Sequence, residues 1–393
     1  MTERASALFD PIRIGPLELR NRTLRAAAFE GMCPAGVPSQ SLVDCHGEIA
    51  AGQAAMTTVA YASVTATGRT FAHQLWLRPS VVPALRKVTD AIHAHGAAAS
   101  IQIGHAGYMA DRAVTGQRSI APSAVLNVYG LALPRAMTLA ELEAMPKHFA
   151  AAAKLCVEAG FDAVEVQAGH GYLLSQFISP YTNRRKDHYG GSLENRARFA
   201  KAVIQRVREA LGKDKALVVK TNLRDGFAGG MPLQEGVRVA QMLEAWGADL
   251  LVLSGGFVSK CPMYVMRGEM PLEPMIENER SRFKRLGLAL FGKWLVEQYP
   301  FNEAYFLEDA LAVRRAVSMP LALVGGLRRR STIDDVLARG FDIAAMARPF
   351  FRDPDFVAKL KAGEAGSVCE PCNHCMATMY HGEAVCPRRD EAE

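Results

Sequence analysis

The chain has 393 residues, of which 49% are hydrophobic and 22% charged, and its formal net charge is +6. No run of eighteen apolar residues occurs, which excludes a membrane span, and the composition excludes general disorder. The scattered basic residues argue against a nucleic-acid partner and fit small anions better. The N-terminus MTERASALFDPIRIG lacks the apolar segment of a secretory signal, so we expect a cytoplasmic protein.

Short apolar segments alternate with helical patterns along the chain. Residues 8–23 carry the Pro/Gly punctuation of a hairpin or lid that precedes the first strand. The predicted strands are residues 24–29, 56–64, 97–103, 161–166, 216–220, 249–254, 321–326 and 341–347. Eight strands alternating with helices predict an α/β fold, the (β/α)8 TIM barrel, which accommodates this length as one domain.

Capping residues mark several of the intervening helices. A helix over 80–95 is closed by a glycine, and Thr138 and Glu141 form a capping box before the next helix. Ser192 can cap a helix with an apolar stripe that stops at Gly212. These signals support the alternation on which the barrel prediction rests.

Two segments exceed a bare barrel. A long insertion of about residues 256–315 separates strand six from helix six, contains four methionines and includes an amphipathic helix around 286–299. It is interpreted as a lid or substrate cap or as a dimer contact, and we expect a homo-oligomer. We therefore predict a barrel domain over 1–365 and a cysteine-rich tail over 366–393.

The tail holds four of the eight cysteines, at Cys369, Cys372, Cys375 and Cys386. In a cytoplasmic chain such a cluster indicates a metal or iron–sulfur site before it indicates disulfides. The spacing Cys-x2-Cys-x2-Cys-x10-Cys leaves open a [4Fe–4S] cluster, a structural zinc ion and an unused site.

Polar and small residues gather at the predicted carboxyl ends of the strands, which converge on one mouth of a barrel. These residues are Ala27, Gln102, Gln167, His170, Tyr172, Lys220, Ser254, Gly325, Gly326 and Arg348. The loops after strands seven and eight are the usual phosphate site of this fold. Since neither a GxGxxG nor a P-loop motif is present, the phosphate is expected to belong to a mononucleotide or to a phosphorylated substrate.

Four segments of the chain resemble the Old Yellow Enzyme family of FMN-dependent NADH:flavin oxidoreductases. The similarity covers about residues 8–355 apart from the insertion. With the cysteine tail it is greatest to the branch of 2,4-dienoyl-CoA reductase and trimethylamine dehydrogenase, although the chain stops before their dinucleotide-binding half. The segments are LFDPIRIGPLELRNRTLRAA, HAHGAAASIQIGHAG, AGFDAVEVQAGHGYLLSQFISPYTNRRKDHYGGSLENRARF and VGGLRRR…GFDIAAMARPFFRDPDF.

The resemblance implies FMN as cofactor and NAD(P)H as electron donor. Lys220 stands where the family usually has arginine beside the flavin, and Phe29 stands where many members carry Thr or Cys. The implied phosphate contacts are Gly325, Gly326, Ala347 and Arg348, and the implied ring contacts are Ala27, Ala28, Phe29, Ala60, Gln102 and Lys220.

The resemblance also implies three catalytic residues. The family's substrate-anchoring pair is represented here by Gln167 and His170, and Tyr172 matches the family's proton donor. A glutamine donates a hydrogen bond but cannot become cationic, so we expect weaker carbonyl activation than a histidine would give.

The function implied is hydride transfer from NAD(P)H through flavin N5 to the activated C=C of an unsaturated carbonyl compound, an ene-reductase reaction on a small molecule. Gln167 and Phe29 weaken that signature, so an FMN-dependent amine dehydrogenase or demethylase remains an alternative. A flavin-free barrel lyase acting on a sugar phosphate and a non-catalytic flavin-binding subunit are alternatives of other classes.

Overall fold

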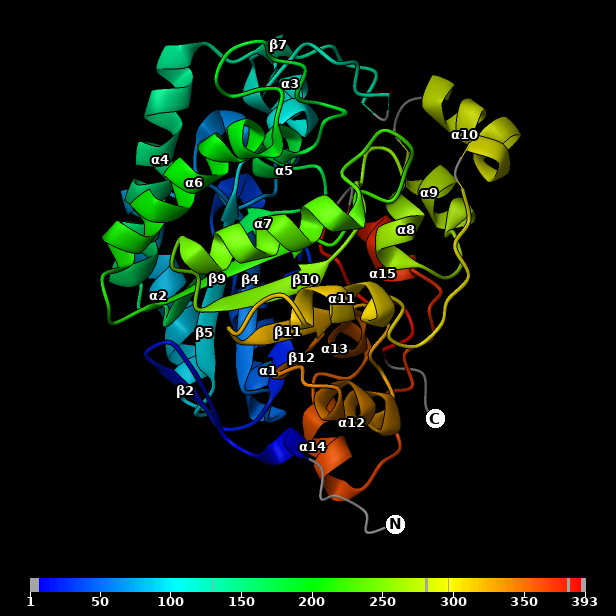
Figure 1. The fold of residues 1–393 in the computed structure, drawn as a ribbon. Helices are drawn as coiled ribbons and strands as arrows, with labels where there is room; N and C mark the ends of the chain where they lie inside the picture. Colours follow the sequence, from blue (N-terminus) through cyan, green and yellow to red (C-terminus); the bar gives the residue numbers. More distant parts are fainter. Residues whose placement is uncertain (1–6, 129, 280–281, 296, 380–381, 390–393) are drawn as a thin grey trace.

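Eight parallel strands close into a barrel in the order β10-β11-β12-β3-β4-β5-β8-β9, as the predicted alternation requires (Figure 1). The structure is a computed structural model and describes residues 7–128, 130–279, 282–295, 297–379 and 382–389. The barrel strands are β3 (Thr23–Arg25), β4 (Met56–Ser63), β5 (Ala98–Gly104), β8 (Ala163–Ala168), β9 (Ala216–Asn222), β10 (Leu250–Ser254), β11 (Leu321–Val324) and β12 (Ile343–Met346). The TIM-barrel prediction is therefore confirmed.

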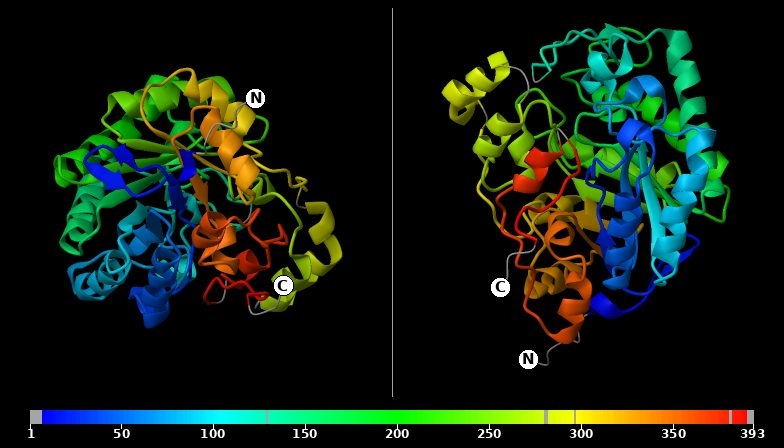
Figure 2. Two further views of the ribbon diagram at one scale, coloured as in Figure 1. Left: turned by 90° about the horizontal axis from the view of Figure 1, so that it is seen from below. Right: turned by 180° about the vertical axis from the view of Figure 1, so that it is seen from behind.

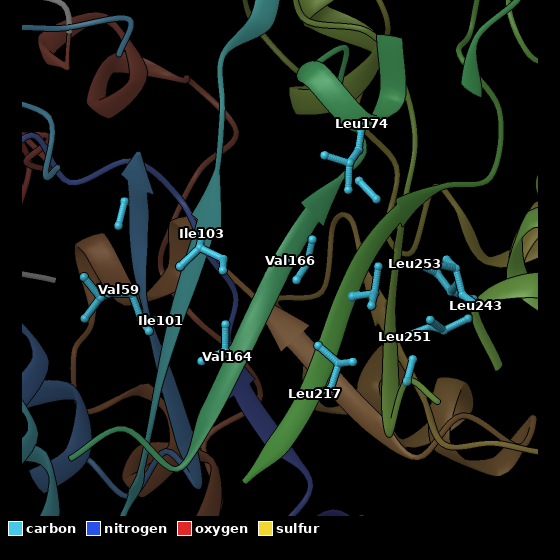
Figure 3. Close-up of a cluster of buried hydrophobic side chains, with 14 of the residues drawn as sticks. Val59, Ile101, Ile103, Val164, Val166, Leu174, Leu217, Leu243, Leu251 and Leu253 are labelled. Atoms are coloured by element: carbon cyan, nitrogen blue, oxygen red, sulfur yellow. The ribbon is translucent and has the colours of Figure 1, made fainter. Parts of the chain in front are cut away.

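Alternation along each strand separates two layers of side chains. On β8, Val164 and Val166 face the helices and join a large cluster with Leu217 and Leu251 (Figure 3). Ala163, on the opposite face of β8, belongs to a smaller cluster at the base of the barrel interior. Further up the interior the same alternation places polar residues at the mouth, where the barrel is not filled by apolar side chains.

Helices cover the outside of the barrel (Figure 1). The longer ones are α1 (Gln40–Ala51), α2 (Val82–His93), α4 (Leu139–Glu158), α6 (Leu193–Leu211), α7 (Leu233–Ala245), α11 (Leu307–Arg314) and α12 (Arg330–Ala338). Shorter ones are α3 (Arg112–Thr115), α5 (Leu173–Ile178), α13 (Arg348–Arg352) and α14 (Phe356–Ala362). Short 3-10 turns lie at Ala7–Phe9, Pro34–Gly36, Ala66–Gly68, Pro79–Val81 and Gly107–Met109.

The predicted caps are present. Thr138 and Glu141 make a full capping box at α4, and the Ser192 hydroxyl accepts a hydrogen bond from the Asn195 N–H at α6. The predicted N-terminal hairpin is the antiparallel pair β1 (Ile12–Ile14) and β2 (Leu17–Leu19), and a second two-stranded sheet joins β6 (Ile120–Ala121) to β7 (Arg135–Ala136). Local sequence chemistry therefore fixes these boundaries.

The first barrel strand is shorter than predicted, because β3 ends at Arg25 and not at Phe29. Beyond it the Ala60 N–H is satisfied by the Glu30 carboxylate, at 2.9 Å, in place of a main-chain partner on β3. The register between β4 and β5 also shifts between Val59 and Ala62. The segment after β3 is thus freed from the sheet at the mouth of the barrel.

The insertion follows β10, as predicted, and holds α8 (Pro262–Met266), α9 (Leu272–Asn278) and α10 (Arg282–Leu295). It ends before α11, which the predicted range of about 256–315 had included. The tail contains α15 (His374–Thr378), which contacts α9, and both views of Figure 2 show the tail beside the insertion. Parts of the predicted tail, 380–381 and 390–393, lie outside the described residues. Within the described part of the chain, no helix combines the length and apolarity that a bilayer crossing needs.

Candidate active site

Three polar side chains meet inside the mouth of the barrel. Gln102 on β5 donates from Nε2 to Oε1 of Glu165 on β8 at 2.5 Å, and Nζ of Lys220 on β9 lies 3.4 Å from the same oxygen. The strand register aligns Gln102 with Glu165, and Gln167 with Lys220. The predicted cofactor residues Gln102 and Lys220 are therefore joined through a carboxylate.

This network is buried. Glu165 is 0% exposed and Lys220 is 2% exposed. Burial lowers the pKa of Lys220, and the neighbouring Glu165 opposes that shift. Oε2 of Glu165 has no hydrogen-bond partner within the described residues, so the network retains a buried acceptor. An unsatisfied buried carboxylate oxygen is costly and marks a place where another donor fits.

The segment after β3 borders this network. The Ala27 carbonyl accepts a hydrogen bond from Lys220 Nζ at 3.1 Å. Beneath it, the guanidinium of Arg25 lies 2.5 Å from the carboxylate of Glu30, which also holds the Ala60 N–H. Lys220 thus holds the backbone at the predicted ring contact Ala27, and Glu30 of the buried ion pair holds it at Ala60.

Phe29 lies in an aromatic group at the edge of the mouth. Its ring stacks on Phe71 with centroids 5.0 Å apart and lies 5.6 Å from His73. His73 Nε2 contacts the carbonyl of Met379 in the tail at 2.8 Å. Ala28 packs against a small tail cluster that includes Cys375 and Ala384. Phe29 and Ala28 therefore lie where the tail meets the barrel.

The predicted phosphate residues line one small cavity of about 60 Å³ at the ends of β11 and β12, which is called the phosphate cavity below after that prediction. They are Gly325, Gly326, Ala347 and Arg348. Both glycines have positive φ, 122° and 76°, and a Cβ on either would lie within 3 Å of Tyr305. Glycine is required here because the backbone must turn closely beneath an aromatic wall, which leaves main-chain N–H groups for an anion.

Of the predicted catalytic residues, Gln167 lies near the end of β8, and His170 and Tyr172 follow that strand. Gln167 is buried, and its Oε1 accepts a hydrogen bond from the Gly169 N–H at 3.3 Å. His170 takes a positive φ of 59°, fixed by a hydrogen bond from its N–H to Asn222 Oδ1 at 2.9 Å. The Tyr172 ring packs edge-on against Tyr61, with centroids 5.0 Å apart. The three side chains therefore lie together at the end of β8 and in the turn that leads into α5.

His170 is neutral near pH 7. Burial and, to a smaller extent, the charge of Lys220 lower its pKa to about 3. Its Nε2 lies 2.7 Å from the Ser254 hydroxyl at the end of β10, which orients the ring. A neutral imidazole can still donate one hydrogen bond but carries no charge to an acceptor.

The four tail cysteines line one cavity of about 240 Å³ together with Arg348, Arg352 and Arg388. Among the described residues, however, no three Cys, His, Asp or Glu side chains lie close enough together to hold a metal ion. Burial raises the pKa of Cys369 and of Cys375 to about 12, so these thiols are protonated. The structure thus brings the cysteines to one cavity but does not support the predicted metal or zinc site.

Several residues of the site were not anticipated. Glu165 is the most informative, because a glutamate within an otherwise apolar strand is rarely buried without a partner and so signals a polar interior. Asn222, which anchors His170, and Tyr305, which walls the phosphate cavity, come from distant segments. No local sequence signal indicates that such residues meet.

The chain matches one family model and is similar to several known proteins. The family model described as "NADH:flavin oxidoreductase / NADH oxidase family" matches residues 7–283. The chain is 43% identical to 4,4'-dithiodibutanoate disulfide reductase of Rhodococcus erythropolis, over 97% of this chain and 95% of the relative. It is 32% identical to NADH oxidase of Thermoanaerobacter brockii, over 93% of this chain and 52% of the relative.

Among solved structures, a 2-naphthoyl-CoA reductase complexed with 2-naphthoyl-CoA superposes with a TM-score of 0.82 and 25% identity, covering 98% of this chain and 57% of that one. The chain therefore spans only about half the length of some relatives and nearly all of another.

Proposed function

Because this chain belongs to the NADH:flavin oxidoreductase / NADH oxidase family, we propose that it is an FMN-dependent reductase that uses NAD(P)H to reduce the activated C=C of an unsaturated carbonyl compound. The observation that carries the proposal is the position of a phosphate cavity and a buried cation, Lys220, on one barrel mouth. Membership of a flavin oxidoreductase family argues against the alternative of a flavin-free lyase.

The residues present fit FMN. Gly325, Gly326, Ala347 and Arg348 would hold its phosphate, and the backbone near Ala27, Ala28 and Ala60, with Phe29, Gln102 and Lys220, would surround its ring. The unpartnered Glu165 Oε2 leaves an acceptor for a ring N–H or water. When bound, FMN would supply the chemistry of hydride transfer between NAD(P)H and the acceptor.

Lys220 supplies a positive charge in a dry environment, where charge stabilisation is strongest. Glu165 partly offsets that charge, because its carboxylate lies 3.4 Å from the ammonium. Lysine offers a point charge without the fork of an arginine, so Gln102 supplies the directional contact on the same side. Lys220 and Gln102 together would therefore give moderate stabilisation of negative charge on the reduced flavin.

The acceptor carbonyl is held by hydrogen bonds from Gln167 and neutral His170. Tyr172 then donates its phenolic proton to Cα of the double bond, and the proton is recovered from solvent. The balance is one C=C, one NAD(P)H and one proton consumed, with one saturated product and one NAD(P)+ formed. A positioned proton donor of this kind contributes roughly 10²- to 10⁴-fold to the rate.

The test measures oxidation of NADH or NADPH, in separate assays, with enones and small disulfides as acceptors; amines are tested in parallel as electron donors, with an artificial electron acceptor in place of the nicotinamide. The proposal expects nicotinamide oxidation that depends on an enone. Oxidation of amines with no enone reduction would instead establish the amine dehydrogenase or demethylase alternative.

A second candidate acceptor is a small organic disulfide that carries carboxylates. It is favoured by the 43% identity to a relative named for 4,4'-dithiodibutanoate, over nearly the full length of both chains. Two cations also flank Tyr181 at the mouth: Lys260 Nζ lies 5.2 Å and Arg184 Cζ lies 5.9 Å from its ring centre. Within the described chain, neither forms an ion pair with a carboxylate, so both are available to an anionic acceptor.

Disulfide reduction also balances, because one NAD(P)H and one proton convert the disulfide to two thiols. Lys260→Gln should raise KM for a dicarboxylate disulfide severalfold and leave KM for a neutral enone unchanged. If Lys260→Gln leaves KM unchanged for the disulfide as well as for the enone, Lys260 has no anion-binding role. Lys201→Gln, on the distant helix α6, is the matched control.

For the tail we propose that the cysteine cavity accepts an iron–sulfur cluster. Its four cysteines share one cavity, and Arg348, Arg352 and Arg388 in its lining would balance the negative charge of a cluster held by thiolates. Iron and sulfide analysis of anaerobically prepared protein tests this: zinc alone, or neither iron nor sulfide, contradicts it.

A further inference from the structure

Asn373 lies where the cysteine loop, the insertion and the phosphate cavity meet. It stands between Cys372 and Cys375, is 1% exposed and has a positive φ of 59°. Its Oδ1 accepts a hydrogen bond from Arg348 Nη1 at 2.5 Å, and its Nδ2 donates to the carbonyl of Glu269 at 2.8 Å. A buried amide with contacts to two distant segments is well placed to hold them in register.

Arg348 connects the two cavities. Its side chain lines both the phosphate cavity and the cysteine cavity. Besides Asn373, its Nη1 donates to the carbonyl of Arg267 in the insertion at 3.0 Å. The orientation of this guanidinium at the phosphate cavity is therefore set by acceptors that belong to the tail and to the insertion, and not by the barrel.

Further contacts join the same parts. Glu269 N–H donates to the Pro371 carbonyl at 3.0 Å, and Arg328 Nη1 donates to the Cys369 carbonyl at 3.1 Å. Cys369 and Pro371 themselves line the phosphate cavity. One wall of the phosphate cavity is thus made by the cysteine loop.

We propose that Asn373 is a positioning residue for the FMN phosphate: the folded cysteine loop presents its Oδ1 to Arg348, and so raises the retention of FMN. This inference rests on the proposed FMN site and adds to it a dependence on the tail. When the loop is unfolded or the amide is absent, Arg348 loses its shortest hydrogen-bond acceptor and is free to leave the phosphate. The cysteine loop would therefore affect cofactor retention through Arg348, at the phosphate end of the FMN site.

The experiment measures the Kd for FMN of the deflavinated full-length chain. Asn373→Gly keeps the left-handed backbone that φ 59° requires and removes only the amide. We expect FMN binding to weaken roughly five- to tenfold, less than the full effect of losing a hydrogen bond to a charged group, because the amide acts on the phosphate only through Arg348. Asn373→Asp retains the acceptor for Arg348 and should bind FMN within about twofold of the parent.

Two controls separate positioning from general stability. Thr378→Ala removes a hydrogen bond to the Cys375 carbonyl at 3.0 Å inside the tail and touches neither Arg348 nor Asn373, so it should leave the FMN Kd unchanged. In an Arg348→Gln background, Asn373→Gly should cause no additional loss, since the two residues act as a unit.

The outcomes are distinguishable. If the parent chain does not bind FMN, the proposed function is wrong and the inference falls with it. If the parent binds FMN and Asn373→Gly binds it equally well, only the inference is wrong. Equal weakening by Thr378→Ala and Asn373→Gly, or additive losses in the Arg348→Gln background, would assign the effect to tail stability and overturn the positioning role.

Discussion

At the scale of single residues, the chemistry depends on polar groups that the barrel would otherwise exclude. Glu165 and Lys220 lie on neighbouring strands, both nearly inaccessible to solvent, and each makes the burial of the other tolerable. Removing one partner leaves an uncompensated charge, so each residue can be tested by its effect on a bound flavin.

The first prediction concerns this pair. Lys220→Met removes the positive charge and should lower the reduction potential of bound FMN, whereas Glu165→Gln removes the negative charge and should raise it. Redox titration of the two variants measures both. Shifts in the same direction, or no shift in either, would mean that these charges do not act on the flavin.

The second prediction concerns Tyr172. Tyr172→Phe should leave reduction by NAD(P)H nearly intact and slow the reduction of an enone by roughly 10²- to 10⁴-fold, because only the second half-reaction needs its proton. Stopped-flow measurement of each half-reaction separates the two. Equal slowing of both would identify Tyr172 as a structural residue.

The third prediction concerns pH. Burial lowers the pKa of His105 from 6.5 to about 3, and its Nδ1 accepts a hydrogen bond from the Gly107 N–H at 2.9 Å. Below pH 6.5 the unfolded chain binds a proton that the folded chain refuses, so stability falls as the pH falls toward 3.

His105→Asn keeps an acceptor and does not titrate, so its free energy of unfolding should fall less steeply on acidification, by up to about 1.4 kcal/mol per pH unit. Urea unfolding between about pH 7 and pH 5 measures this slope. His95→Asn, at an exposed position, is the control. A slope unchanged by His105→Asn would show that other groups carry the pH dependence.

At the scale of elements, short-range chemistry was sufficient for most boundaries. All eight strands were predictable because each is a short apolar run between turns, and Thr138, Ser192 and Gly212 mark helix ends through contacts within a few residues. The exception was β3, where the chain leaves the sheet because Glu30 takes the Ala60 N–H. That contact spans thirty residues and has no local signature.

The fourth prediction tests one of these boundaries. Thr138→Ala should lower the free energy of unfolding by about 1 kcal/mol, because the α4 capping box loses its acceptor, and Thr138→Ser should restore it. Denaturant unfolding of both variants gives the comparison. Equal stability of parent and Thr138→Ala would show that tertiary packing alone fixes the start of α4.

In the candidate site, too, some features could be predicted from the sequence and others could not. Positions at strand ends, such as Gln102 and Lys220, follow from barrel topology, because the carboxyl ends of all strands share one mouth. The partners that those side chains contact cannot be predicted from the topology. Arg348 was expected to meet a phosphate, yet its orientation depends on Asn373 and Arg267, which lie 25 and 81 residues away in sequence.

At the scale of the whole molecule, three additions surround one barrel mouth: the turn after β8, the insertion and the cysteine tail. The insertion supplies Tyr305 to the phosphate cavity, and the tail supplies Cys369 and Pro371. The insertion therefore lies at this cavity, and its role as a lid, a substrate cap or a dimer contact stays a prediction. A homo-oligomer and the choice between NADH and NADPH stay predictions.

The central claim is that this mouth binds FMN and passes hydride from a nicotinamide to an organic acceptor. Anaerobic mixing of the FMN-saturated full-length chain with NADH or NADPH tests it most directly, by following the flavin absorbance. The account predicts that the absorbance bleaches with at least one nicotinamide and returns when an enone or a dicarboxylate disulfide is added. A chain that binds no FMN after reconstitution, or bound FMN that neither nicotinamide bleaches, would contradict it.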